Sequence, residues 1–182
     1  MRKVIAGLFI SLDGVVESPK KWQFDHFDAD MMAGMATQTG SEDTVLLGRV
    51  TYQEWAPYWP TSDDQLYGAH INSTPKYVVS TTLKELEGGK WDKPTLINGN
   101  PANELAKLKK QPGKNIGVAG SPTLVRSLLK DDLLDELTLM IHPVVVGSGK
   151  RLFQDGGELK RYKLAYSKPT TTGVLILTYQ PR

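Results

Sequence analysis

The stretch N-I-G-V-A-G-S-P-T-L-V-R-S-L-L, Asn115 to Leu129, decides the fold of this chain. Its residues 116–119 are apolar and end at Gly120, and a segment with apolar residues at helical spacing follows. Ser121 fits the N-cap of that helix because its hydroxyl can accept a hydrogen bond from a free backbone N–H. Pro122 fits the first helical position because its φ is already helical. The stretch therefore predicts a strand, a tight turn and a helix.

The turn at Gly120 has the properties of an anion-binding site. Free N–H groups and the positive end of the helix dipole face out of it, and a glycine lets another molecule approach the backbone. One helix end contributes only about 0.3–1 kcal/mol to the binding of a surface charge, so a nucleotide needs further contacts. An ordinary strand–turn–helix connection without a ligand explains the same residues. Both interpretations stay open at this point.

Composition sets the broad class. The 182 residues predict one domain, 1–182, and the hydrophobic (40%) and charged (23%) fractions are typical of soluble globular proteins. The chain has no cysteine, which excludes disulfides, a thiolate nucleophile and cysteine metal ligands. A net charge of +2 does not indicate nucleic acid or a membrane as partner. No apolar run approaches the ~20 residues of a membrane span, and residues 1–11 fit a first strand better than a leader, so we expect a cytoplasmic protein.

Strand and helix patterns alternate over the first two-thirds of the chain. Strands are predicted at 3–10, 44–47, 76–80, 95–97, 116–119 and 135–142, helices at 25–38, 49–55, 62–70, 101–110 and 122–129, and a loop at 85–92. Residues 162–167 and 173–179 alternate as a hairpin does. The alternation predicts an α/β fold with a mixed, mainly parallel central sheet, flanking helices and a C-terminal antiparallel hairpin.

The first predicted helix, 25–38, carries three methionines at helical spacing, Met31, Met32 and Met35. Methionine commonly fills gaps in cores, so we expect all three to be buried. Asp25 or Asp28 is expected to cap the helix.

Polar or glycine-bearing turns follow four of the predicted strands. Ligands of open α/β sheets collect at the carboxyl ends of the strands, near the point where the strand order reverses. The turns at 11–14, 48–51, 80–82 and 117–123 are expected at this one edge, and together they predict a binding site.

Arg49 stands at the strand-to-helix turn after Gly48. Its forked donor array is suited to gripping a phosphate, although a solvated arginine is the plainer interpretation. Ser80, Thr81 and Thr82 are short hydroxyl donors at the neighbouring strand end, and they favour a shared phosphate. An arginine near an adenosine ribose is the physical basis for selecting the 2′-phosphate of NADP.

Other motifs are weaker. Gly147-Ser148-Gly149-Lys150 is not a Walker A sequence, because the positions that require glycine and Ser/Thr are Val144 and Arg151, and it lacks the third glycine of a dinucleotide fingerprint. It predicts a tight turn. There is no G-x-S-x-G elbow, so hydrolase chemistry is not favoured.

The three histidines, His26, His70 and His142, do not have metal-ligand spacing, and no metal site is predicted. His142 precedes Pro143 at a strand end. We expect it to be a structural histidine with its hydrogen bonds satisfied.

Asp13 follows the first strand in an Asp-Gly pair, so a conformational role and a role in binding are equally open. Trp22 can stack on a planar ring, and Asp25 or Asp28 can hydrogen-bond a pterin-like or pyrimidine-like heterocycle. The residues alone do not say which carboxylate faces inward.

Taken in order, several motifs resemble one family. They are S-L-D-G (11–14), L-L-G-R-V-T-Y (46–52), G-V-A-G-S-P-T-L-V (117–125), L-L-D-E-L (133–137) and H-P-V-V-V-G-S-G-K-R-L-F (142–153). Together they resemble the dihydrofolate reductase-like superfamily, and more closely its stand-alone branch related to the riboflavin-biosynthesis reductase (RibD C-terminal) domain.

The resemblance implies an NADPH groove, a substrate pocket and often a homodimer. It places the cofactor on Gly48, Arg49, Thr51, Ser80, Thr81, Gly117, Gly120, Ser121, Thr123 and Leu124, and the substrate near Asp13. Trp22 and Asp28 remain candidate substrate contacts from the residues themselves. It assigns no catalytic residue.

The sequence departs from the family pattern at two places, one at the substrate site and one at the cofactor turn. Dihydrofolate reductases carry an acidic residue in the first helix, and alignment on Trp22 puts Phe27 there, with Asp28 one place away. Ala119-Gly120 replaces the glycine pair at the pyrophosphate turn. We therefore expect an NADPH-dependent reductase of a small heterocycle, similar to 5-amino-6-(5-phosphoribosylamino)uracil reductase. The alternatives are a dihydrofolate reductase and a non-catalytic NADPH-binding dimer.

Overall fold

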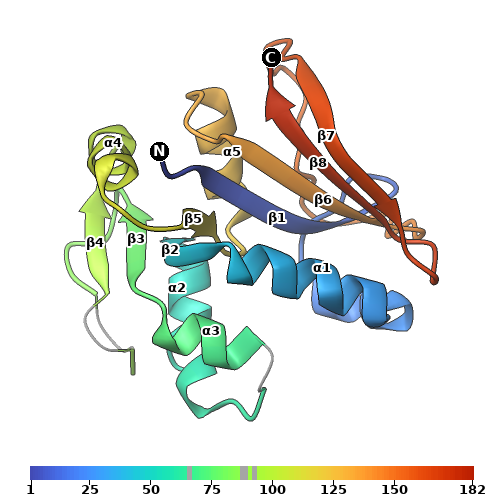
Figure 1. The fold of residues 1–182 in the computed structure, drawn as a ribbon, viewed down its shortest axis with the longest axis horizontal. Coiled ribbons are helices and arrows are strands. Elements are labelled where there is room, and N and C mark those ends of the chain that lie inside the picture. The colour runs from blue at the N-terminus through green and yellow to red at the C-terminus, as the bar shows by residue number, and fades with distance from the viewer. Residues whose placement is uncertain (65–66, 87–89, 92–93) are drawn as a thin grey trace.

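The computed structural model describes residues 1–64, 67–86, 90–91 and 94–182. It contains an eight-stranded sheet in the order β4-β3-β2-β5-β1-β6-β8-β7 (Figure 1). The strands are β1 (Val4–Ser11), β2 (Glu42–Gly48), β3 (Lys76–Ser80), β4 (Thr95–Asn98), β5 (Asn115–Val118), β6 (Glu136–His142), β7 (Tyr162–Pro169) and β8 (Leu175–Pro181). Strands β1 to β6 pair in parallel, and β8 is antiparallel to both β6 and β7. The predicted fold class is confirmed, including the closing hairpin.

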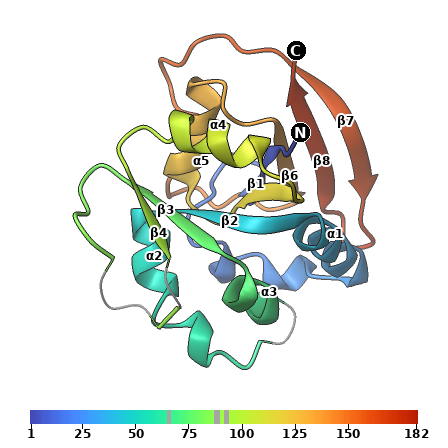
Figure 2. The same cartoon turned by 60° about the vertical axis from the view of Figure 1, so that its left-hand side comes forward.

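Helices cover both faces of the sheet. They are α1 (Ala29–Gly40), α2 (Arg49–Trp55), α3 (Tyr67–Ser73), α4 (Ala102–Lys110) and α5 (Pro122–Lys130). Helices α4 and α5 lie on one face, and α1, α2 and α3 lie on the other (Figure 2). Alternate residues of β1 explain this, because Val4, Ala6, Leu8 and Ile10 pack with α4 and α5 whereas Phe9 packs with the α1 methionines.

Most predicted boundaries are within two residues of the observed ones, but the first helix begins at Ala29 rather than at residue 25. Residues Phe24–His26 form a short 3₁₀ helix instead. Asp28 is the N-cap, and its Oδ1 accepts a hydrogen bond from Met31 N at 2.9 Å. Two other predictions fall partly outside the described residues: the helix predicted at 62–70 includes residues 65–66, and the loop predicted at 85–92 includes residues 87–89 and 92.

The methionine prediction is wrong at one position. Met31 is fully buried and Met35 packs partly against the same cluster, but Met32 is 42% exposed. Helix α1 is flanked by the sheet on one side only, so successive residues cannot both face the core. Within the described ranges, no helix combines the length and the apolar character needed to cross a membrane.

Candidate functional site

Two strand-to-helix turns are tied together at the carboxyl edge of the sheet. Strands β2 and β5 pair in parallel, so their following turns are neighbours. Gly48 N donates to Ser121 Oγ at 2.7 Å, and Ser121 Oγ donates to Thr51 Oγ1 at 2.8 Å. Thr51 Oγ1 also accepts from Ser121 N at 3.1 Å. The turn that starts α2 and the turn that starts α5 are thereby fixed relative to each other.

Ser121 does not cap α5 with its side chain, and that prediction is wrong. Its φ is +55°, and its hydroxyl bonds to the other turn instead. The first intrahelical bond of α5 runs from Val125 N to Ser121 O. The N–H groups of Thr123 and Leu124 precede that bond and have no intrahelical partner. The N-terminus of α5 therefore keeps donors that a ligand can use.

Gly120 lies directly before this helix in the left-handed region, at φ +53°. A Cβ added there would lie 3.1 Å from Thr51 Cγ2 and 3.4 Å from the Trp55 ring. The turn therefore requires glycine both for its backbone angles and for its close packing on α2.

Arg49 and Ser80 lie at adjacent strand ends, because Gly48 pairs with Val79 in the β2–β3 register. The exposed Arg49 donates from Nη1 to Gln53 Oε1 at 3.2 Å, one turn along α2. Ser80 is buried, and its Oγ accepts from the N–H groups of the following turn at 3.0 and 3.1 Å. Arg49 thus keeps further donors for a ligand, whereas the Ser80 hydroxyl oxygen is already used in shaping its turn.

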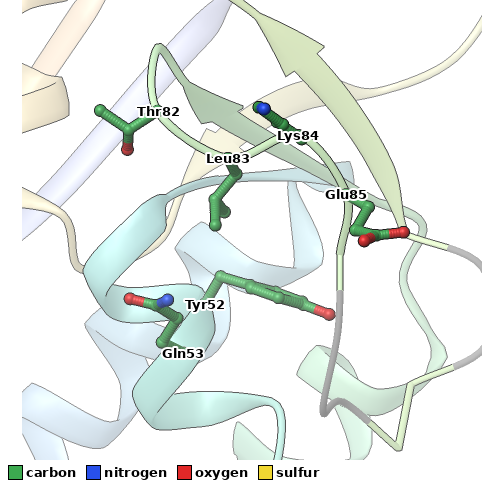
Figure 3. A pocket seen from close by; sticks show the side chains of 6 residues that line it. All are labelled: Tyr52, Gln53, Thr82, Leu83, Lys84 and Glu85. Carbon is green, nitrogen blue, oxygen red and sulfur yellow. The ribbon is translucent and has the colours of Figure 1, made fainter.

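A pocket of about 250 Å³ opens between α2 and the turn after β3 (Figure 3). Leu83 points toward the Tyr52 side chain of α2, whereas Lys84 points away from it. Thr81, predicted as a cofactor contact, is exposed at the start of the same turn. The lining residues are Tyr52, Gln53, Thr82, Leu83, Lys84 and Glu85. The sequence alone did not identify Tyr52 and Lys84 as pocket residues. The available signal was their position, one to four residues from the hydroxyl residues and Arg49.

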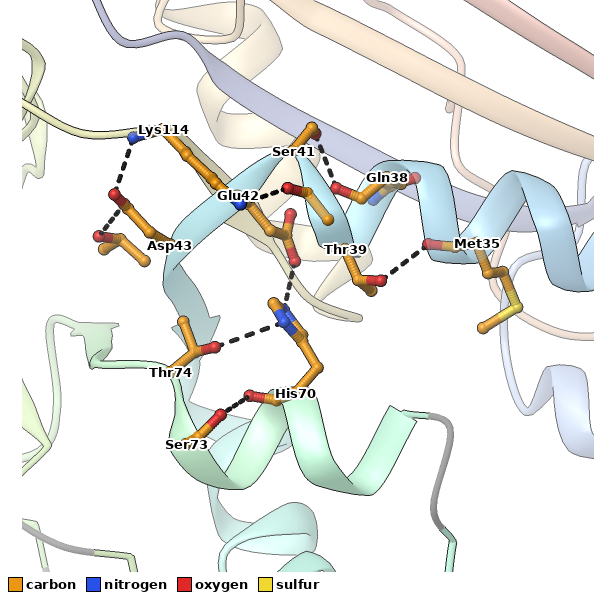
Figure 4. Close-up of polar contacts among 12 residues, drawn as sticks. Met35, Gln38, Thr39, Ser41, Glu42, Asp43, His70, Ser73, Thr74 and Lys114 are labelled. Carbon is orange, nitrogen blue, oxygen red and sulfur yellow. Dashed lines mark hydrogen bonds and ion pairs between the residues drawn. The ribbon is translucent and has the colours of Figure 1, made fainter.

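Gly117, predicted as a cofactor contact, lies against a side chain of β2. A Cβ there would lie within 3 Å of the Glu42 carboxylate, which packs directly on the β5 backbone. Glu42 Oε1 bonds His70 Nε2 of α3 at 2.8 Å (Figure 4), and burial raises the pKa of Glu42. Gly117 is buried within β5 and leaves room for the Glu42 carboxylate. A cofactor contact by Gly117 stays a prediction.

Asp13 joins the β1 turn to the loop after β6. Its carboxylate accepts from Ser11 Oγ at 2.6 Å, from Val146 N at 3.1 Å and from Gly147 N at 2.9 Å, and Arg151 lies 3.6 Å away. These hydrogen bonds, the one from Ser11 first, lower the pKa of Asp13 to about 2. The carboxylate is therefore ionised at neutral pH and already holds the loop, which favours the conformational role. A substrate contact by Asp13 stays a prediction.

Asp28 is similarly occupied. Besides the Met31 N–H, it accepts from Thr171 Oγ1 at 2.8 Å and from the N–H and hydroxyl of Thr172, both at 2.9 Å. Burial raises the pKa of Asp28, but these hydrogen bonds outweigh it and hold the pKa well below its usual range. Three of these contacts fall on Oδ2 and one on Oδ1, and the Thr172 hydroxyl also lies 2.7 Å from His26 O. Asp28 joins α1 to the β7–β8 turn.

Trp22 lines a second pocket, of about 370 Å³. Its indole packs edge-on against the ring of His142, with centroids 5.3 Å apart. The pocket lies between the Trp22 segment and the loop after β6, and its lining residues are Glu17, Ser18, Lys21, Trp22, Val144, Val145, Val146, Ser148 and Gly149. The loop predicted from the Gly147–Lys150 motif is therefore one wall of a pocket, as a turn near a ligand would be.

His142 is only half satisfied, in contrast to the prediction. Nδ1 lies 2.9 Å from Met140 O, but Nε2 is buried and has no partner among the described residues. The sequence could not show this, because the rings around His142 come from separate segments.

Comparison with known proteins shows the family. Residues 2–176 match the model of the RibD C-terminal domain. The Bacillus subtilis (strain 168) protein YyaP is 33% identical over 183 residues, which cover 98% of this chain and 94% of YyaP. YwjB of the same organism is 31% identical over 160 residues, covering 85% and 84%.

Solved structures share the fold. A protein of Shewanella sp. PV-4, described as a riboflavin biosynthesis protein, superposes with a TM-score of 0.80 at 22% identity and 99% coverage of both chains. A pyrimidine reductase-like protein of Corynebacterium diphtheriae gives 0.69 at 15% identity, covering 100% of this chain and 92% of the other. The diaminohydroxyphosphoribosylaminopyrimidine deaminase/5-amino-6-(5-phosphoribosylamino)uracil reductase of Thermotoga maritima gives 0.70 at 14% identity, and this chain spans 57% of it.

Proposed function

Since the chain belongs to the RibD C-terminal domain family, we propose that it is an NADPH-dependent reductase of a small heterocyclic substrate of the aminopyrimidine class. The observation that supports this most is the hydrogen-bonded pair of turns at the carboxyl edge of β2 and β5. Gly48, Thr51 and Ser121 hold these turns together, and ligands of open α/β sheets bind at such an edge.

The pyrophosphate of the cofactor would lie at the start of α5. Gly120 exposes backbone there in a conformation that other residues rarely adopt, and the N–H groups of Thr123 and Leu124 have no intrahelical partner. Arg126, one turn further on, donates to Thr123 Oγ1 at 3.3 Å and has a buried Nη1 without a partner among the described residues. These groups fit a negatively charged ligand.

The adenosine 2′-phosphate would lie near Arg49. The guanidinium is exposed beside the 250 Å³ pocket, whose rim carries Lys84 and the Thr82 hydroxyl. Two cations and short hydroxyl donors favour NADPH over NADH.

Bound NADPH supplies the hydride, so the protein has to bind, orient and shield the substrate. The 370 Å³ pocket has Trp22 as an aromatic wall and Val144–Val146 as an apolar wall, a lining typical of pockets that bind planar rings. Asp13 holds the apolar wall in place by accepting hydrogen bonds from Val146 N and Gly147 N. With a pKa of about 2 it has no proton to give at neutral pH.

The two alternatives have less support. A folate reductase needs a carboxylate that is free to bind the pterin, whereas both oxygens of Asp28 already accept hydrogen bonds that join α1 to the β7–β8 turn. A non-catalytic NADPH-binding module does not need the second pocket.

We also propose that the protein works in the cytoplasm as a homodimer, as the family resemblance implies. The edge strand β7 exposes Leu164 and Tyr166, which a second copy could cover. Sedimentation velocity measures the assembly state.

Thermal unfolding with NADPH, NADH and ATP tests the cofactor site. A cofactor at 100 times its Kd adds about 2.7 kcal/mol to the free energy of unfolding. Arg49→Ala should weaken NADPH binding about 10- to 100-fold, the effect of losing charge-assisted hydrogen bonds, and should leave NADH binding unchanged. Arg161→Ala, which removes an exposed arginine at the other end of the sheet, is the matched control.

Turnover then separates the candidates. NADPH oxidation is followed with aminopyrimidine substrates and, separately, with dihydrofolate. Oxidation with aminopyrimidines alone supports the proposal, and oxidation with dihydrofolate supports the folate alternative. NADPH binding without oxidation supports the non-catalytic module, and a protein that NADPH does not stabilise would refute all three.

A further inference from the structure

Two imidazole nitrogens under the Trp22 segment have no hydrogen-bond partner among the residues that the structure describes. They are Nε2 of His142 and Nδ1 of His26, on rings whose centroids lie 6.2 Å apart at 89°. His142 has no exposed surface. Burying a polar atom without a hydrogen-bond partner costs free energy. Such a cost is expected where a bound molecule completes the hydrogen bond.

Aromatic rings surround His142. Trp22 lies edge-on at 5.3 Å and Phe9 at 5.7 Å between centroids, and the His26 ring occupies a third side. These rings exclude bulk water, and the Trp22 N–H is directed to Glu17 O at 3.4 Å rather than to His142. Rings therefore surround the His142 imidazole, and among the described residues none donates a hydrogen bond to Nε2.

The contact made by Nδ1 fixes the chemistry of Nε2. Nδ1 lies 2.9 Å from Met140 O. A carbonyl oxygen can only accept, so Nδ1 carries the proton. Burial, aided by nearby His26, lowers the pKa of His142 although the Met140 hydrogen bond opposes this. In the neutral ring Nε2 is a bare lone pair, and it can accept a hydrogen bond but cannot donate one.

The proposed substrate pocket and the His142 ring have the Trp22 side chain as a common neighbour. Trp22 lines the 370 Å³ pocket and packs on the His142 ring. Val144, on the opposite wall, donates its N–H to His142 O at 2.8 Å. The Trp22 indole N–H makes one long hydrogen bond, to Glu17 O at 3.4 Å.

From these contacts we propose that His142 determines substrate specificity: its Nε2 accepts a hydrogen bond from an N–H group of the substrate ring, with the Trp22 indole moved aside. The site then selects heterocycles that carry ring or amino N–H groups over their N-alkylated analogues. The inference rests on the proposed function, because it takes the 370 Å³ pocket to be the substrate site.

Nitrogen NMR of the wild-type protein with ¹⁵N-labelled histidine tests this directly. The probes are uracil, which has ring N–H groups, and 1,3-dimethyluracil, which has none. Uracil should move the His142 Nε2 resonance from the position of a free lone pair toward that of a hydrogen-bonded one, and 1,3-dimethyluracil should not. A resonance that uracil leaves unmoved, or that already has the hydrogen-bonded position in the free protein because of a buried water, would overturn the proposal.

The variant His142→Phe keeps an aromatic ring and removes the acceptor. It should bind uracil about tenfold more weakly, the loss expected for one neutral hydrogen bond, and bind 1,3-dimethyluracil equally well. Equal uracil affinity in both proteins contradicts the proposal. If the variant does not fold, the wild-type NMR result decides alone.

Stabilisation by NADPH, measured in parallel on both proteins, reports the cofactor site independently. NADPH that stabilises neither protein counts against the reductase itself. Normal NADPH stabilisation with an unmoved Nε2 counts only against the role of His142.

Discussion

Removing the Ser121 hydroxyl should separate the two turns that carry the proposed cofactor site. Ser121→Ala deletes the acceptor of Gly48 N (2.7 Å) and the donor to Thr51 Oγ1 (2.8 Å). Each lost hydrogen bond is worth about 1 kcal/mol, so the free energy of unfolding should fall by about 2 kcal/mol. For a chain of this length that corresponds to a fall in Tm of about 4–8 °C. Urea unfolding at constant pH gives the free energy, and calorimetry gives Tm.

Three comparisons show whether the hydrogen bonds are the cause. Ser127→Ala, an exposed serine on the same helix, should change the free energy of unfolding by less than about 0.5 kcal/mol. Ser121→Gly also loses the hydroxyl but relieves the left-handed backbone at φ +55°, so it should be more stable than Ser121→Ala by about 1 kcal/mol. A double-mutant cycle with Thr51→Val should give a coupling energy of about 0.5–1.5 kcal/mol. Strict additivity, or a loss no larger than that of Ser127→Ala, would refute the reasoning.

Three further predictions concern single positions. Gly120→Ala should lower the free energy of unfolding by about 1–2 kcal/mol and weaken NADPH binding, because a side chain is strained at φ +53°. The control Gly156→Ala (φ +81°, with open space around it) should strain the backbone similarly but leave NADPH binding unchanged. Equal effects of the two changes on NADPH binding would contradict the assignment of Gly120 to the cofactor site. Asp28→Asn should lower Tm at pH 7. Because the pKa of Asp28 is depressed in the folded protein, the difference in Tm between variant and wild type should shrink as the pH falls below about 4. A Tm difference that calorimetry finds constant with pH argues against this prediction. The pKa of Glu42 is raised in the folded protein, so the stability that this carboxyl contributes is lost as the pH rises above 4.5 through the folded pKa. Glu42→Gln should therefore become more stable relative to wild type as the pH rises over this range, as measured by urea unfolding. A difference in the free energy of unfolding that does not depend on pH would count against this prediction.

The fold could be predicted from the sequence because its signals are local. The Gly120-Ser121-Pro122 turn marks the end of β5 and the start of α5 within one residue. Hydrophobic spacing and turn residues act over a few positions, and they also located the closing hairpin.

The use of individual side chains could not be predicted in the same way. The Ser121 hydroxyl was expected on its own helix, but it bonds to Thr51, 70 positions away in the sequence. Gly117 was expected as a cofactor contact, and no signal in the sequence showed that it also accommodates the carboxylate of Glu42. In both cases the tertiary partner is distant in the sequence, and no spacing rule in a single sequence identifies that partner.

The polar groups that the protein leaves unsatisfied say more about recognition than those that it satisfies. Asp13 and Asp28 attract attention in the sequence as carboxylates, but a ligand that bound either one would have to displace hydrogen bonds that hold two segments together. His142 Nε2 has no such bond to lose, so a donor that reaches it recovers the cost of a buried unpaired acceptor. A carboxylate suits the paired N–H donors of a pterin, whereas a neutral imidazole nitrogen accepts one hydrogen bond. The proposed role of His142 therefore corresponds to a substrate that is recognised through a single neutral hydrogen bond at this position.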